Sequence, residues 1–116
     1  MPDSQIALKL IYRANIFMVN PTRPALQVGR DDSNDIVVVS LFASRVHARV
    51  ELRDGQFVLT DLSSNGTFLL LDDESAERRL RQAEMILTGR GWFGLGKSAA
   101  RHGDHSVRFA VQAEAG

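Results

Sequence analysis

The sequence predicts an all-β fold, a two-sheet antiparallel β-sandwich of about eleven strands. Apolar residues recur at every second position through much of the chain, as at Leu8, Leu10 and Tyr12. Turn segments rich in Gly, Asn, Asp and Pro interrupt these runs about every 8–12 residues. With 116 residues, of which 44% are hydrophobic, the chain is long enough to bury one core and too short for two.

The first half of the chain alternates short strands with turns. Its expected strands are 6–12, 15–19, 26–29, 36–39, 46–53 and 56–60. A tight turn at 13–14 joins the first two, and the Pro-containing segment 20–24 forms the next turn. Asp54-Gly55 between two alternating runs predicts a hairpin.

The second half continues the pattern with one ambiguous stretch. Its expected strands are 67–71, 85–87, 92–95 and 107–112. The charged segment Asp72–Glu84 contains Ala, Glu and Arg, and this composition permits a helical turn. We expect one domain over residues 6–112, with flexible ends at 1–5 and 113–116.

Composition excludes several classes of function. Fourteen basic residues balance fourteen acidic ones, so no bulk charge indicates nucleic acid or an anionic membrane as a partner. The absence of Cys excludes disulfides, thiolate zinc sites and Cys nucleophiles. No apolar run is long enough to span a membrane, and the first residues lack the features of a signal peptide. We therefore expect a cytoplasmic protein.

Polar residues gather in three expected loops, at 29–30, 44–47 and 64–67. Because the loops of a sandwich lie at its ends, these three could share one site. Together they offer two guanidinium groups, several hydroxyls and a carboxamide, which suit a phosphate group and a peptide backbone. They contain no general base and no metal-ligand cluster. The pattern therefore predicts binding without catalysis, and without a metal or another cofactor.

The three blocks resemble, in order and spacing, the signature of the forkhead-associated (FHA) domain. They read Gly29-Arg30, Ser44-Arg45-x-His47 and Ser64-Asn65-Gly66-Thr67. The resemblance covers roughly residues 6–112. It implies a sandwich of eleven strands that recognises phosphothreonine peptides in Ser/Thr-kinase signalling. The partner would be a phosphorylated protein or a phosphorylated segment of the parent chain. Some relatives are instead phospho-independent interaction domains, and this alternative stays open.

The resemblance also implies a role for each site residue. Arg30, Ser44 and Arg45 would hold the phosphate, with Ser64 against it, and Asn65 would hydrogen-bond the peptide backbone. Leu41 and Phe42 would read the third residue after the phosphothreonine and prefer an apolar one. Four residues would be structural: Gly29, His47, Gly66 and Thr67.

Simpler interpretations of the same residues compete with these roles. Arg30 could form a surface salt bridge with one of the acidic residues at 31, 32 or 35, and Ser44 could simply begin a strand. Leu41 and Phe42 could face the core, as apolar loop residues usually do. Asn65-Gly66 could be only a tight turn that favours positive φ.

Three further features need interpretation. Gly91–Ser98 matches the nucleotide-binding pattern G-x-x-x-x-G-K-[ST], which would make the chain an enzyme, but that pattern requires a long helix, and Gly103 and Asp104 would interrupt one. His102 and His105 are expected to be solvated turn residues.

Many FHA relatives carry Gly-Asp where this chain has residues 82–84, and the segment 80–96 resembles the variety attached to bacterial adenylate/guanylate cyclases.

Overall fold

A computed structural model describes residues 6–99 and 103–113, in which all regular structure is β except at Ala99, which has 3₁₀ conformation. The strands are β1 (Ile6–Tyr12), β2 (Asn15–Val19), β3 (Ala25–Gly29), β4 (Ile36–Val37), β5 (Ala48–Arg53), β6 (Gln56–Asp61), β7 (Thr67–Leu71), β8 (Arg78–Leu80), β9 (Glu84–Leu87), β10 (Arg90–Leu95) and β11 (Val107–Ala113). Among the described residues we find no helix that could span a membrane. The expected flexible ends lie outside the described residues, apart from Ala113, which belongs to β11.

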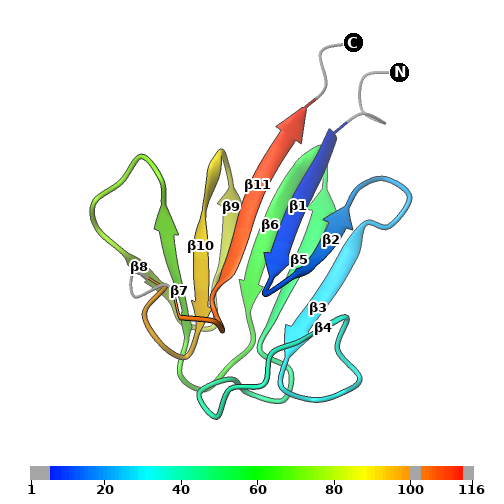
Figure 1. Cartoon of the computed structure of the whole chain (residues 1–116). Coiled ribbons are helices and arrows are strands. Elements are labelled where there is room, and N and C mark those ends of the chain that lie inside the picture. Colours follow the sequence, from blue (N-terminus) through cyan, green and yellow to red (C-terminus); the bar gives the residue numbers. More distant parts are fainter. Residues whose placement is uncertain (1–5, 100–102, 114–116) are drawn as a thin grey trace.

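The strands form two sheets that pack face to face (Figure 1). The six-stranded sheet has the order β2-β1-β11-β10-β7-β8, and the five-stranded sheet has the order β4-β3-β5-β6-β9. Ladders are antiparallel except β3–β4, in which Val28 pairs with Ile36 in parallel. The loop after β3 returns along that strand until the Asp35 amide donates to the Gln27 carbonyl (2.9 Å), so β4 repeats the direction of β3. The predicted β-sandwich is confirmed.

Three local expectations are wrong. The segment 72–84 forms no helical turn; it contains β8, which pairs with β7. The β-branched run 36–39 stays in a strand only to Val37. The strand expected from residue 46 begins at Ala48, so residues 44–47 belong to the preceding loop.

Alternating side chains from both sheets build the core between them. Leu10, Phe93 and Phe109 come from the larger sheet and Val50 and Leu59 from the smaller one, and all five are fully buried. The rings of Phe93 and Phe109 lie 6.3 Å apart between centroids, in a tilted arrangement. Each such side chain contributes about 1.5–3 kcal/mol by leaving water. This core holds the strand ends, and therefore the loops, in fixed positions.

Strand direction places the polar loops at one end of the sandwich, the lower end in Figure 1. There β3, β6 and β10 end, and β5 and β7 begin. The connections 30–35, 38–47 and 62–66, together with the residues that follow Leu95, consequently meet at this end. We call it the loop end.

Candidate functional site

Gly29 lets the first two polar loops touch. A Cβ atom at this position would lie 2.3 Å from the Arg45 carbonyl oxygen, so any other residue would push the two segments apart. The Arg30 amide donates to the Ser44 carbonyl (2.9 Å), and the Asp31 amide donates to that of Arg45 (3.1 Å). The glycine is therefore required by this close approach, not by an unusual backbone conformation.

Both site arginines are exposed at the loop end. Arg30 Nε donates to the Ala43 carbonyl (3.1 Å), and in the described part of the chain neither Arg30 nor Arg45 makes a salt bridge. Hydrogen bonds from Ser33 lower the pKa of Asp31, and the charges of Arg45 and Arg30 lower it further. Two guanidinium groups thus lie near each other, and both have N–H donors available for a ligand.

Two of the three acidic residues that could have neutralised Arg30, Asp31 and Asp35, have other partners. The Asp35 carboxylate binds Arg23 Nη2 (2.8 Å) and the Gln27 amide (2.8 Å). Asp31 accepts the Ser33 hydroxyl at 2.5 Å. Arg30 thus forms no salt bridge with Asp31, Asp32 or Asp35, although its charge lowers the pKa of Asp31.

His47 is fully buried and joins the second polar loop to the third. Its Nδ1 accepts a hydrogen bond from the Ser44 amide (2.9 Å), and its Nε2 donates to the Gly66 carbonyl (2.9 Å). Only a neutral ring protonated on Nε2 satisfies both contacts. Next to this brace, the Ser64 amide points at the Ser44 hydroxyl oxygen (3.4 Å), which brings two of the predicted phosphate ligands together.

The buried ring makes stability depend on pH. Burial lowers the pKa of His47 below its ordinary value of 6.5. Below about pH 6.5 the unfolded chain therefore binds a proton that the folded chain does not. The free energy of unfolding should fall as pH drops from 7.5 to 5.5, by at most about 1.4 kcal/mol per unit. Urea unfolding at several pH values should show a shallower dependence for His47→Gln, and equal dependence in both proteins would contradict this assignment.

The Asp61 carboxylate organises the third loop from inside the protein. It is buried, and its Oδ1 accepts the hydroxyls of Ser63 (2.6 Å) and Thr67 (2.7 Å). Its Oδ2 accepts a hydrogen bond from the backbone amide of Gln82 (2.9 Å). The Ser63 hydroxyl oxygen in turn accepts the Gly66 amide (2.8 Å). These bonds fix the backbone on both sides of Asn65.

Asn65 stands exposed at the tip of this loop, and Gly66 allows the turn behind it. Gly66 has φ +94°, and a Cβ atom there would lie 2.9 Å from the Leu80 carbonyl oxygen. Asn65 itself has no positive φ, so only the glycine uses the left-handed region. Arg79 from β8 donates to the Asn65 carbonyl through Nη2 (2.6 Å) and Nε (3.2 Å). The Asn65 carboxamide is therefore presented on a supported loop.

Gln82 occupies the place where the chain departs from the FHA pattern. It has φ +52°, a conformation that costs a non-glycine residue more than a glycine. Its amide binds Asp61, and its side-chain Nε2 donates to the Ser63 carbonyl (2.5 Å). The segment thus supports the third loop without the glycine that many relatives have.

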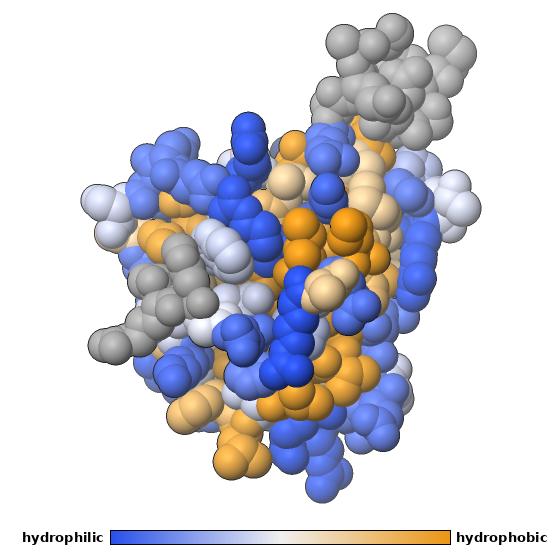
Figure 2. Space-filling view, in the orientation of Figure 1, coloured by the Kyte–Doolittle hydropathy of each residue, from blue (hydrophilic) through white to orange (hydrophobic). Residues whose placement is uncertain are grey.

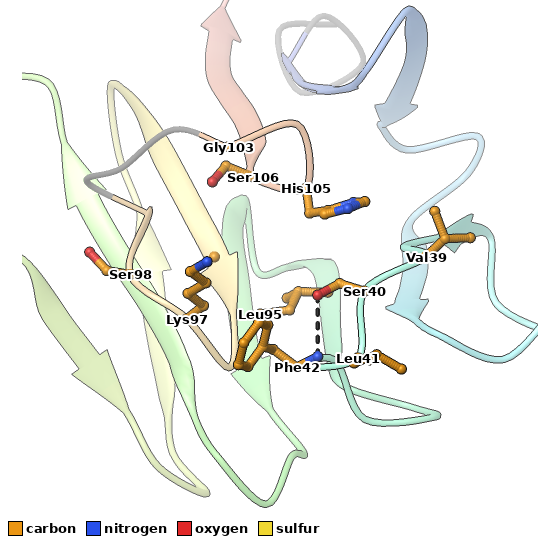
Figure 3. Close-up of a pocket in the computed structure, with 11 residues that line it drawn as sticks. Val39, Ser40, Leu41, Phe42, Leu95, Lys97, Ser98, Gly103, His105 and Ser106 are labelled. Carbon is orange, nitrogen blue, oxygen red and sulfur yellow. Dashed lines mark hydrogen bonds between the residues drawn. The ribbon is translucent and has the colours of Figure 1, made fainter.

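The interpretation in which Leu41 and Phe42 face the core is wrong. Leu41 is 93% exposed and Phe42 is 50% exposed. Both line a pocket beside the predicted phosphate ligands, into which Lys97 also projects (Figure 3). The Phe42 amide donates to the Ser40 hydroxyl (3.2 Å), which holds this short loop in place.

The two remaining motifs have other structural roles. Most of the nucleotide-binding match lies in β10, where Gly91 pairs with Leu71, so it does not form a loop around a phosphate. His105 lies in a turn, as expected, but it is half-buried, and its Nδ1 contacts the Tyr12 hydroxyl (2.9 Å). His102 lies outside the described residues. Over residues 6–99 and 103–113, no three His, Cys, Asp or Glu side chains cluster as metal ligands would.

Sequence reasoning missed several residues that shape this end. Asn34 is buried, and its Nδ2 binds the carbonyls of Asp31 (2.8 Å) and Arg45 (2.6 Å). Arg79 and Lys97 act on loops far from them in sequence, whereas Asp61 directly precedes the loop that it organises. Only Asp61 gave a usable signal, because a carboxylate that ends an apolar strand must find buried partners.

Comparisons with known proteins agree with this geometry. The sequence model described as "FHA domain" matches residues 26–89. The structure resembles Rv1747 FHA-1 of Mycobacterium tuberculosis, with a TM-score of 0.69, 20% identity, and coverage of 92% of this chain and 97% of that one. It also resembles the N-terminal FHA domain of Rad53p from S. cerevisiae, solved with a phosphothreonine peptide (TM-score 0.64, 15% identity, 93% and 94% covered).

A third similar structure is EmbR of Mycobacterium tuberculosis, solved with a low-affinity phosphopeptide. It has a TM-score of 0.64 and 25% identity, over 96% of this chain and 25% of that one. Among proteins with curated descriptions, none matches the chain significantly in sequence.

Proposed function

The chain belongs to the FHA domain family, and from this premise we propose that its loop end is a non-catalytic recognition site for phosphothreonine peptides. The observation that carries the proposal is the pair of exposed guanidinium groups of Arg30 and Arg45, which form no salt bridge among the described residues. A phosphate dianion is the ligand that such a pair binds most strongly.

The neighbouring groups complete a site for a phosphorylated side chain. Ser44 and Ser64 lie together, as the 3.4 Å approach of the Ser64 amide to the Ser44 hydroxyl indicates, and their hydroxyls would donate to phosphate oxygens. Asn65 would hold the peptide backbone, since a carboxamide both donates and accepts. Backbone bonds and the His47 brace hold these groups in place before any ligand arrives, which reduces the entropy lost on binding.

Leu41 and Phe42 would contact the peptide after the phosphothreonine. Their exposure on the loop that leads into Ser44 supports a preference for an apolar third residue. The partner would be a phosphorylated protein, or a phosphorylated segment of the parent chain, in cytoplasmic Ser/Thr-kinase signalling. On the resemblance of segment 80–96, the domain would be the regulatory part of a larger bacterial protein.

Phosphothreonine should bind better than phosphoserine. We expect the threonine γ-methyl group to pack beside the Asn65 loop, and one buried methyl contributes about 0.8 kcal/mol, which is about fourfold in affinity. Calorimetric titration of matched phosphothreonine, phosphoserine and unphosphorylated peptides, selected from a phosphothreonine library, measures the effect. Equal affinity for the two phosphopeptides would refute the methyl contact. Equal affinity for the unphosphorylated peptide would instead indicate a phospho-independent interaction domain.

A further inference from the structure

A pocket of about 460 Å³ opens beside the phosphate-site residues, between residues 39–42 and the connection that follows β10 (Figure 3). Its apolar lining includes Val39, Phe42 and Leu95, and Lys97 adds an ammonium group. Apolar side chains exposed at the lower end of the molecule are also visible in Figure 2. The pocket therefore combines apolar walls with one positive charge.

Close packing at Gly96 sets the position of Lys97. A Cβ atom on Gly96 would lie 2.1 Å from the Phe42 carbonyl oxygen, and Gly96 has φ +74°. Both the close approach and the left-handed backbone conformation therefore require glycine. The Gly96 amide donates to the Gly66 carbonyl (2.9 Å), the same oxygen that His47 binds. The connection after β10 is thereby fixed to the phosphate-site loops.

Lys97 extends over the ring of Phe42, with its Nζ 5.0 Å from the ring centroid. The residue is exposed, and across the described ranges it forms no salt bridge. The loop 40–43 is itself uncharged, so sequence reasoning predicted only an apolar contact here. The structure adds a cation to that contact from a distant part of the chain.

The pocket is continuous with the proposed phosphate site. Phe42 precedes Ser44 by two residues, and Arg30 Nε binds the carbonyl of Ala43 between them (3.1 Å). An extended peptide advances about 3.3 Å per residue. A peptide whose phosphate is held by Arg30 and Ser44 therefore reaches this pocket within a few residues.

We propose that the pocket takes an apolar side chain of the phosphopeptide together with a neighbouring carboxylate, and that Lys97 pairs with this carboxylate. The preferred ligand is then a phosphothreonine peptide with an apolar third residue and an acidic residue next to it. This inference rests on the proposed function and assigns specificity to Lys97. The carboxylate would lie beside the Lys97 ammonium group, which already packs on the Phe42 ring. This packing restricts the positions from which the carboxylate can pair with Lys97.

A charge-swap experiment tests the proposal. Phosphothreonine peptides with Leu at the third position carry Asp, Asn or Lys at the second or the fourth position. The wild-type protein should prefer Asp over Asn by roughly two- to fivefold at one of these positions, and the preference should shrink in high salt. Lys97→Glu should reverse the preference and favour the peptide with Lys.

Lys9→Glu is the matched control, because it makes the same charge change on β1, away from the pocket. It should keep the wild-type preference for Asp. The proposal is overturned if the wild-type protein does not distinguish Asp from Asn, or if Lys97→Glu behaves like Lys9→Glu. Discrimination between phosphorylated and unphosphorylated peptides is measured in the same series. If that discrimination survives while the charge swap has no effect, only Lys97 is wrongly assigned; if it is absent, the proposed function fails as well.

Discussion

Arg30→Ala is expected to weaken binding of a phosphothreonine peptide at least tenfold without unfolding the domain. A hydrogen bond between a guanidinium and a phosphate contributes about 1.5–3 kcal/mol, and about 1.4 kcal/mol is tenfold in affinity. The substitution removes the bond from Arg30 Nε to the Ala43 carbonyl, which contributes about 0.5–1.5 kcal/mol. It keeps the backbone amide bond that ties this segment to Ser44, and the side chain itself is exposed. Affinity should therefore fall while the domain stays folded.

Calorimetric titration and urea unfolding together check this result. Arg90→Ala is the control, because Arg90 is an exposed arginine at the start of β10, at the opposite end of the sandwich. It removes one positive charge and should leave the affinity nearly unchanged at moderate salt. Near-normal binding by a folded Arg30→Ala protein would show that the phosphate lies elsewhere.

Asp61→Ala should lower the free energy of unfolding by about 3–5 kcal/mol, the usual cost of removing one partner from a buried charged network. The change leaves the hydroxyls of Ser63 and Thr67 and the Gln82 amide without their acceptor. Each buried group that loses its partner costs about 1–3 kcal/mol. Since a domain of this size is stable by only about 5–15 kcal/mol, much of the protein would unfold under mild conditions.

Urea unfolding of the wild-type protein, Asp61→Ala and Asp73→Ala measures this effect. Asp73 is an exposed carboxylate in the turn after β7, and its removal should change stability by no more than about 0.5 kcal/mol. If Asp61→Ala loses less than about 1 kcal/mol, the network does not hold the third loop, and the support that we assign to Asn65 is wrong.

The fold could be predicted because most strands bury one face. Alternation at Leu8, Leu10 and Tyr12 reflects side chains that point alternately into the core and outward. The edge strand β8 gave no such signal, since its three residues are largely exposed and it exists through pairing with β7. Val46 is the opposite case: it continues the alternation of β5, which predicts a strand, but it lies exposed in the preceding loop.

The site could be predicted only in part. Its motifs are contiguous in the sequence, whereas some of the residues that hold the loops in place are distant in the sequence. Gly29-Arg30 and Asn65-Gly66 can be recognised in the sequence because the residues of each pair are adjacent in the chain. The positions of Arg79 at the Asn65 carbonyl and of Lys97 over Phe42 depend on how distant segments meet in the fold. No spacing in the chain encodes such contacts.

The most direct test of the central claim is an amide chemical-shift titration of isotope-labelled protein with a library-selected phosphothreonine peptide and with its unphosphorylated twin. The phosphopeptide should shift amide signals at the loop end, above all those of Arg30, Ser44, Arg45, Ser64 and Asn65. The twin should leave these signals nearly unmoved at the same concentration. Equal shifts from both peptides, or phosphopeptide shifts confined to the opposite end around Gly55 and Gly89, would contradict a phosphothreonine site at the loop end.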